Sequence, residues 1–234
     1  MDKNKLLDFK ELESYVDLFH VISHKTKETL STLTNKPIIS VPLWINQNNW
    51  FDLENKDQLR KQFGFRNDDF LIGSFQRDTE GHDLKSPKLI KGPDIFIEII
   101  KKINKENKNL KVILTGKRRQ YVINKLNELR VPFEYYEMVS VKKLNELYNI
   151  LNLYIVSSRL EGGPQAIVEC GITKTPIIST NVGIAPEILN SKSIFEDSNY
   201  ENATPDIETA YENAKKLSLP MGMEPYIKLF EELL

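Results

Sequence analysis

The 234-residue chain has little of what marks several protein classes. Its one cysteine, Cys170, excludes an internal disulfide framework and fits a reducing compartment. The charged N-terminus lacks the apolar core of a signal peptide, and no run approaches the roughly 18 apolar residues of a membrane span. A formal net charge of -1 provides no basic excess for nucleic acid. We therefore expect a cytoplasmic protein without a transmembrane segment or nucleic-acid partner, and leave peripheral membrane association open.

Glycine is absent from the first 63 residues, and all ten glycines lie at or after Gly64. Because a loop that lets backbone approach a phosphate usually needs glycine, such a loop is expected in the later part of the chain. Pro42-Leu43-Trp44 and the polar run 46–49 indicate a linker. We therefore expect an N-terminal segment with its linker at 1–45, a main domain at 46–218 and a C-terminal helix at 219–234.

The main domain is expected to alternate strands and helices. Short apolar runs predict strands, and helical spacing with Pro93 at a first position predicts helices. This alternation indicates an α/β fold with a doubly wound parallel sheet. The predicted strands are 70–75, 110–114, 133–138, 151–156, 176–179 and 193–195. The predicted helices are 93–107, 117–129, 141–150, 163–171, 185–189, 203–217 and 224–234.

The richest candidate site follows the strand 151–156, at the sheet edge where such folds bind ligands. Gly162-Gly163 precedes Pro164, which suits a first helical turn, and the helix start offers free N–H groups to an anion. Glu161 lies in the loop and Glu169 on the helix, and carboxylates accept hydrogen bonds from sugar or ribose hydroxyls. The spacing therefore predicts a sugar-nucleotide site. A tight turn with two solvated glutamates would explain the same spacing.

Residues 157–189, SSRLEGGPQAIVECGITKTPIISTNVGIAPEIL, resemble the donor-site signature of family 4 retaining glycosyltransferases. Glu161 and Glu169 are separated by seven residues, and Thr175-Pro176 and the segment 182–187 follow in the order of the signature. A second stretch, residues 63–100, has an arginine after the first strand and Lys-Gly before the next helix. The resemblance extends over most of residues 14–234 and implies the Rossmann-like C-terminal domain of a GT-B enzyme.

The resemblance also implies residue roles. Glu169 would bind the ribose hydroxyls and Glu161 the hydroxyls of the transferred sugar. Arg77 and Lys91 would neutralise the pyrophosphate and stabilise it as it leaves. The backbone that would lie against the sugar and pyrophosphate is Gly162, Gly163, Pro164, Gln165 and Ala166.

Three assignments stay open. The insertion 79–90 separates Arg77 from Lys91 and leaves the Arg77 assignment open; solvated loop charges are the alternative for both residues. Lys117 follows a strand and is either a phosphate or base contact or a surface charge at a helix start. Gly183 stands in the last loop of the signature, where the family often has two adjacent glycines.

No metal or redox cofactor is expected. The chain has no Asp-x-Asp, which argues against the metal-dependent site of GT-A enzymes. His20, His24 and His82 lack metal-ligand partners at useful spacing, since VDLFHVIS around His20 reads as a strand. No Gly-x-Gly-x-x-Gly follows a strand, which argues against a nicotinamide cofactor.

By this resemblance, we expect an enzyme that transfers a hexose-type sugar from a nucleoside diphosphate sugar to a hydroxyl of a glycan or lipid-linked acceptor, with retention. Two alternatives remain: a nucleotide-sugar-binding module without transferase activity, and a GT-B epimerase. The first 45 residues look like a remnant of the N-terminal acceptor domain. Either the chain is a fragment, or another chain supplies the acceptor side.

Overall fold

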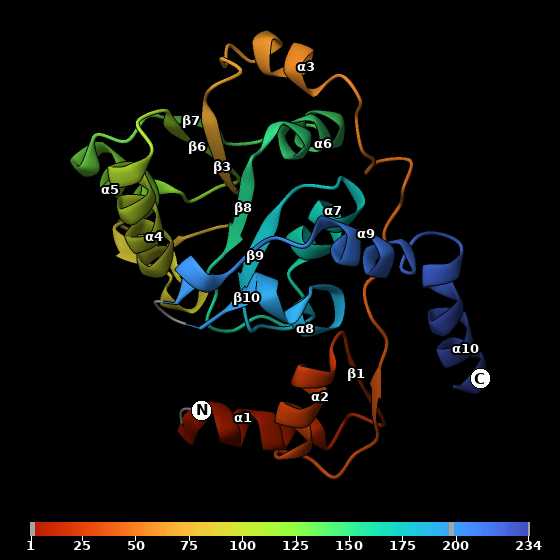
Figure 1. Cartoon of the computed structure of the whole chain (residues 1–234). Coiled ribbons are helices and arrows are strands. Elements are labelled where there is room, and N and C mark those ends of the chain that lie inside the picture. Colours follow the sequence, from red (N-terminus) through yellow and green to blue (C-terminus); the bar gives the residue numbers. More distant parts are fainter. Residues whose placement is uncertain (1–2, 197–198, 234) are drawn as a thin grey trace.

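A six-stranded parallel sheet forms the centre of the computed structural model, which describes residues 3–196 and 199–233 (Figure 1). The strand order is β10-β9-β8-β3-β6-β7. Buried Val, Ile and Leu side chains dominate its central strands, as expected for a sheet covered on both faces. The strands are β3 (Phe70–Ser74), β6 (Leu110–Thr115), β7 (Phe133–Tyr136), β8 (Leu153–Val156), β9 (Ile177–Thr180) and β10 (Ile194–Phe195).

Helices cover both faces of this sheet (Figure 1). On one face, Ile99 of α4 (Pro93–Glu106) and Leu126 of α5 (Gln120–Leu129) belong to the buried cluster that includes Val112. On the other, Leu147 and Ile167 belong to a second buried cluster. The helices of this second face are α3 (Lys56–Gln62), α6 (Val141–Ile150), α7 (Gln165–Ile172), α8 (Ala185–Ile188) and α9 (Ile207–Lys215). The predicted doubly wound α/β fold is confirmed.

The chain reverses direction across the sheet between β3 and β8. From β3 it moves outward to β6 and β7, and then returns to place β8 on the other side of β3. Ile72 of β3 is opposite Val112 of β6 and opposite Leu153 of β8. The loops that follow β3 and β8 therefore diverge at this switch point and leave a crevice at the carboxyl edge of the sheet.

The N-terminal segment lies beside the main domain (Figure 1). It consists of α1 (Lys3–Glu13), β1 (Phe19–Val21), α2 (His24–Ser31) and β2 (Ile38–Ser40), and its two strands pair in parallel. The rings of Phe9 and Phe19 stack at 5.8 Å. The C-terminal helix α10 (Glu224–Glu232) lies alongside, with the Tyr226 ring 5.4 Å from that of His20. The N-terminal segment and α10 therefore contact each other through β1.

Two backbone connections run side by side between the main domain and the part of the molecule that contains this segment and α10. The linker after β2 meets the chain that leaves α9, where Ile45 N–H donates to Leu217 O at 2.8 Å and Leu219 N–H donates to Ile45 O at 3.1 Å. The side chain of Gln47 adds a hydrogen bond to Leu219 O at 2.8 Å. The linker and the returning chain thus form one short paired strap.

Several element boundaries differ from the predictions. The helix predicted from residue 117 begins at Gln120, because Arg118 takes a left-handed φ of 59°. The helix predicted from residue 203 begins at Ile207, where the Asp206 side chain accepts a hydrogen bond from Thr209 N–H. Pro164 caps α7 in an extended conformation and does not enter its first turn. The end of the helix predicted to reach residue 234 lies outside the described residues.

Other elements lie where the sequence predicts none. These are α1, α2, α3 and a short antiparallel hairpin of β4 (Thr79–Glu80) and β5 (Ser86–Pro87) inside the 79–90 insertion. The predicted strand around His20 shrinks to three residues, and Ser23 then caps α2 by accepting from Thr26 N–H. Four single-turn 3-10 helices complete the described chain: η1 (Leu89–Lys91), η2 (Ser191–Ser193), η3 (Tyr200–Asn202) and η4 (Met221–Met223).

Candidate functional site

Gly92 brings the loop after β3 against the end of β8. Its φ of 59° is left-handed, and a Cβ atom there would lie 1.8 Å from Ser157 O. Ser157 Oγ also donates to Gly92 O at 2.8 Å. Only glycine fits this contact. It adopts the left-handed φ without strain, and it has no Cβ atom that would collide with Ser157 O. The contact places the neighbouring Lys91 over the end of β8.

Lys91 forms an ion pair with Glu161 across the switch point. Their side chains are 22% and 13% exposed, so the pair is largely shielded from water. Ser158 Oγ donates to the same carboxylate at 2.9 Å, and the Gln76 amide donates to Lys91 O at 3.0 Å. The structure therefore brings together two of the predicted site residues, 70 positions apart, and places a cation and a carboxylate at the carboxyl edge.

The start of α7 offers unpaired N–H groups beside that pair. Within the described chain, the backbone N–H groups of Gly162, Gly163, Gln165 and Ala166 have no acceptor. The first N–H groups of a helix point outward, and the helix dipole adds partial positive charge there. This loop and helix start can therefore hold an anion such as a phosphate.

Glu169 lies one turn further along α7 and is buried, with 8% of its surface exposed. Tyr148 Oη donates to its carboxylate at 2.7 Å. Burial raises the pKa of Glu169 to about 7, although the hydrogen bond from Tyr148 partly opposes that rise. The alternative of two solvated glutamates is therefore wrong, because Glu161 is ion-paired and Glu169 is buried.

A pocket of about 360 Å³ opens beside Glu169. Its walls include Gln165 from the start of α7, Tyr226 from α10, and Trp44 and Trp50 from the linker region. These are the only two tryptophans of the chain. A ligand that reaches Glu169 through this pocket would therefore change the surroundings of every indole in the protein.

The remaining predicted residues lie around this centre. Arg77 is exposed, and its Nε donates to Thr79 O at 3.1 Å in the hairpin. Lys117 is exposed in the loop after β6. In the described part of the chain, neither cation bonds to Glu161. Gly183 is buried after β9, where a Cβ atom would lie 2.6 Å from Gly162 O, so this loop packs against the candidate anion site.

A buried ion pair between Arg119 and Asp78 has no counterpart in the sequence analysis. Arg119 is fully buried, pairs with Asp78, and donates to the carbonyl oxygens of Ser74 and Thr115. It therefore ties together the ends of β3 and β6 and the base of the hairpin. Arg119 stands in the run Lys117-Arg118-Arg119, and nothing in that run distinguishes the buried arginine from its partly exposed neighbour Arg118.

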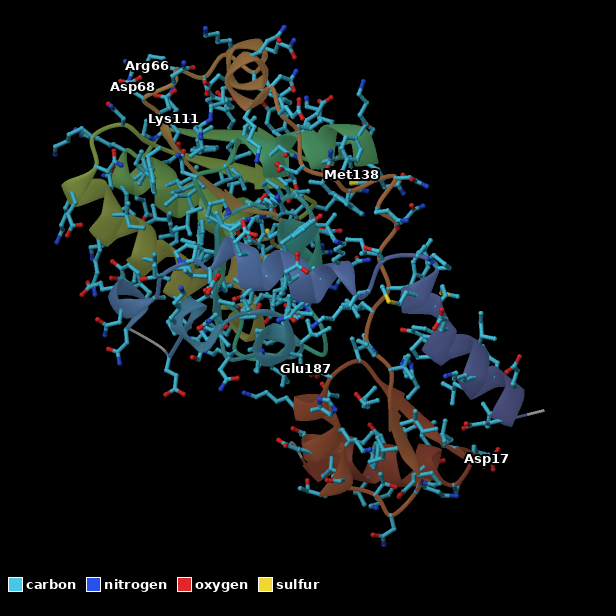
Figure 2. All side chains as sticks on the ribbon, turned by 45° about the vertical axis from the view of Figure 1, so that its right-hand side comes forward. Asp17, Arg66, Asp68, Lys111, Met138 and Glu187 are labelled. Carbon is cyan, nitrogen blue, oxygen red and sulfur yellow. The ribbon has the colours of Figure 1, made fainter. Side chains whose placement is uncertain are left out.

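The N-terminal segment touches the candidate anion site directly. Ser23 Oγ donates to Gly162 O at 3.0 Å, Ile22 packs against Gly163, and His24 N–H donates to Glu187 Oε1 at 2.8 Å. Figure 2 shows Glu187 on the side of the main domain that faces this segment, whereas Arg66, Asp68 and Lys111 lie at the opposite end. The site is thus at the junction of the two parts.

Residues 3–196 and 199–233 contain neither a metal-binding cluster nor a membrane-spanning helix. No three His, Cys, Asp or Glu side chains gather there in a way that could hold a metal ion. None of the helices there has the length and apolar character needed to cross a bilayer.

Comparisons with solved structures identify the fold. Sucrose-phosphate synthase from Thermosynechococcus elongatus matches 99% of the chain with a TM-score of 0.80 and 15% identity. Anabaena HepE, solved with UDP and glucose, matches 100% with a TM-score of 0.79 and 14% identity. A glycosyltransferase from Rickettsia africae matches 99% with a TM-score of 0.72 and 15% identity. The main domain has the architecture of the C-terminal Rossmann-like domain of GT-B glycosyltransferases.

The chain is shorter than these proteins and covers 62%, 68% and 67% of their respective lengths. No curated protein matches the sequence. The family model of the glycosyl transferases group 1 matches residues 84–222, which include Lys91, the α7 start and Gly183. This match covers more than half of the sequence. The chain therefore belongs to the glycosyl transferases group 1 family.

Proposed function

We propose that this chain binds the donor of a retaining, family 4 glycosyltransferase. The reaction would transfer a hexose from a nucleoside diphosphate sugar to a hydroxyl of a glycan or lipid-linked acceptor. One observation carries the proposal: a shielded Lys91–Glu161 pair, four free N–H groups and the carboxylate of Glu169 meet at the sheet's switch point. That arrangement offers separate partners for sugar hydroxyls, phosphate and ribose.

In the proposed binding, Lys91 first exchanges its partner Glu161 for the diphosphate of the donor. The diphosphate lies against the N–H groups at the α7 start and draws Lys91 toward its negative charge. Glu161 is then free to accept hydrogen bonds from the sugar, and Glu169 accepts those of the ribose. As the sugar–phosphate bond breaks, Lys91 stabilises the charge that develops on the leaving diphosphate. Arg77 joins it only if the hairpin moves, because its side chain bonds to Thr79.

A uridine diphosphate sugar is the first donor to test, since HepE was solved with UDP-glucose and with UDP and glucose. UDP-glucose would be titrated into the full chain, with the adenosine and guanosine diphosphate sugars in parallel. Tryptophan fluorescence and calorimetry would report binding. We expect saturable binding of at least one donor, and weaker binding by Lys91→Ala. Lys142→Ala is the control, because Lys142 is an exposed lysine on α6. If none of the three donors binds, the proposed function is wrong.

We also propose that donor binding needs no metal. Lys91 and the α7 start already supply positive charge for the diphosphate, and the sequence has no Asp-x-Asp. Affinity should be the same in excess EDTA as in magnesium or manganese. If EDTA abolishes binding and manganese restores it, a metal takes part.

A second candidate function is a donor-binding subunit without transferase activity. Two observations favour this function. The predicted donor residues all lie between Arg77 and Gly183. Residues 3–45, which would belong to the acceptor side, form a sheet of only two strands. Slow hydrolysis of the bound donor distinguishes the two functions. A catalytic chain releases free sugar above the blank rate, and release should fall in Glu161→Gln. A binding subunit releases none.

A further inference from the structure

A second pocket, of about 300 Å³, lies on the other side of the Glu161 loop. One wall is α2 and the turn that follows it, with Thr26, Thr29, Leu30 and Leu33. The other is formed by the loops after β8 and β9, with Leu160 and Val182. The pocket therefore spans the junction between the N-terminal segment and the main domain.

The polar side chains around this pocket bond to other protein groups, whereas the N–H of Gly162 keeps no acceptor among the described residues. Thr29 Oγ1 donates to Lys25 O at 3.0 Å, and Thr26 Oγ1 donates to Gly162 O at 3.4 Å. Lys25 Nζ donates to Asn181 O at 2.5 Å. The guanidinium of Arg159 forms two hydrogen bonds with the Asp94 carboxylate, at 2.7 and 2.6 Å. Threonine methyl groups and aliphatic side chains therefore form most of the surface that an occupant would meet, and this surface favours an apolar occupant.

The apolar surface continues out of the pocket toward the candidate donor site. Leu160 is 65% exposed, and its N–H donates to Ile90 O at 3.2 Å, which places the two residues side by side. Ile90 is 44% exposed and its neighbour Leu89 53%. Glu161 and Gly162 themselves line the pocket. An occupant would therefore lie next to the carboxylate that we assign to the transferred sugar.

We infer that this pocket holds the apolar part of the acceptor: a hydrocarbon chain or aglycone attached to the sugar or alcohol that receives the hexose. The inference rests on the proposed function, because it takes Glu161 as the position of the transferred sugar. It narrows the acceptor class to molecules with an apolar portion next to the reactive hydroxyl. Free sugars and polar oligosaccharides leave the pocket empty.

The test compares two probes with one sugar and different tails. Octyl β-D-glucoside, kept below its micelle concentration, and methyl β-D-glucoside are titrated into the full chain by ligand-observed NMR, with and without UDP. Each methylene that enters an apolar pocket strengthens binding about fourfold. We expect octyl glucoside to bind at least about tenfold more tightly than methyl glucoside.

Two leucines with equal exposure provide the matched variants. Leu160 lines the pocket, whereas Leu12 lies on α1, and each is 65% exposed. Leu160→Asn should remove most of the octyl preference, and Leu12→Asn should leave it unchanged. Leu33→Ala, deeper in the pocket, should lower it by several fold. Circular dichroism and UDP affinity, measured on each variant, verify that the fold and the donor site are intact.

Three results would overturn the inference: equal affinity for the two glucosides, an octyl preference that survives Leu160→Asn, or one that Leu12→Asn lowers just as much. The last would mean general adsorption to exposed leucines. None of these affects the proposed function, which fails only if donors do not bind. The titration without UDP tests the pocket even in that event.

Discussion

Glu161 and Glu169 have the same side chain but opposite surroundings. Lys91 and Ser158 provide charge and a hydrogen bond for Glu161. Glu169 has only the Tyr148 hydroxyl and lies in the interior, so its charged form is costly there. Eight positions along one loop and helix therefore separate an ion-paired glutamate from a buried one whose pKa is raised to about 7.

The ribose role of Glu169 predicts a binding defect. Glu169→Ala should weaken binding of the nucleoside diphosphate sugar by roughly 1.5–3 kcal/mol, because a charged acceptor of hydroxyl hydrogen bonds is lost. Glu208→Ala, an exposed change on α9, should have no effect. Calorimetric titration measures both. Unchanged affinity in Glu169→Ala would contradict the ribose assignment.

The raised pKa of Glu169 predicts a pH dependence of stability. With a pKa of about 7 in the folded chain against an ordinary 4.5, the folded state binds more protons between these values. Stability should therefore fall as pH rises from about 4.5 to 7, by on the order of 3 kcal/mol in total. Asp69 and Asp94 have lowered pKa values, so they reduce stability only at more acidic pH.

Urea unfolding of the ligand-free chain at pH 5, 6, 7 and 8 measures this effect. Glu169→Gln keeps an acceptor for Tyr148 but cannot ionise, so its midpoint should change less with pH. It should be more stable than the original chain at pH 8. Parallel curves for the two proteins would show that Glu169 titrates at its ordinary pKa.

Residue identity alone could predict part of the site. The spacing of Glu161, Glu169 and Gly162-Gly163 and the resemblance point to the loop after β8 as the candidate site, because these features are local in sequence. The Lys91–Glu161 pair could not be predicted from residues alone, because it depends on how far apart β3 and β8 end. The burial of Arg119 could not be predicted either, because Arg118 carries the same charge one position away.

Among the structural elements, the turn at Gly92 requires glycine for two reasons, its backbone conformation and its close approach to Ser157. Gly92→Ala adds a methyl group 1.8 Å from Ser157 O and imposes a left-handed φ on alanine. We expect a loss of stability of about 2–5 kcal/mol, combining about 1–2 for the backbone and about 1–3 for overpacking. Gly116→Ala is the matched control, since its φ is also positive but a Cβ atom there meets nothing within 4 Å.

Chemical denaturation of the two variants separates the free-energy cost of the left-handed backbone from the cost of the close contact with Ser157. Gly116→Ala should lose only the backbone contribution. Gly92→Ala should also weaken donor binding, because the loop that carries Lys91 must move away from β8. Equal losses in the two variants would mean that the approach to Ser157 relaxes freely.

Regular periodicity determined which elements could be predicted. The helix 141–150 has the bounds expected from its apolar spacing, because Leu144, Leu147 and Tyr148 follow helical spacing and pack into one buried cluster. In contrast, α2 has no buried residue at all and the strands of the hairpin have two residues each. The positions of such elements depend on capping residues and on contacts with residues distant in sequence. Neither produces a periodic apolar pattern in the local sequence.

For the whole molecule, we predict that the 234-residue chain binds its donor but transfers sugar very slowly or not at all. Transfer requires an acceptor hydroxyl held in line with the reacting carbon, and such positioning is worth about 7–11 kcal/mol of the barrier. The N-terminal segment provides one pocket wall and a two-stranded sheet, with Leu7, Leu12 and Tyr15 exposed on or next to α1. We propose that a further acceptor-binding unit, in this protein or another chain, covers that surface.

A turnover assay with labelled donors and acceptors, combined with light scattering, tests this prediction. Slow or absent transfer is expected for the chain alone. Rapid transfer by a monomer would mean that the 234 residues already build the complete acceptor site.

The paired strap at Ile45 and Leu219 has a mechanical consequence. A single linker would let the N-terminal segment swing and twist in any direction. We expect two hydrogen-bonded connections to restrict twisting and to leave rotation about the strap as the easiest movement. Because Ser23 and His24 bond to the main domain away from that axis, a small rotation separates them from Gly162 and Glu187. We therefore expect that the N-terminal segment moves relative to the candidate site mainly by rotation about the strap.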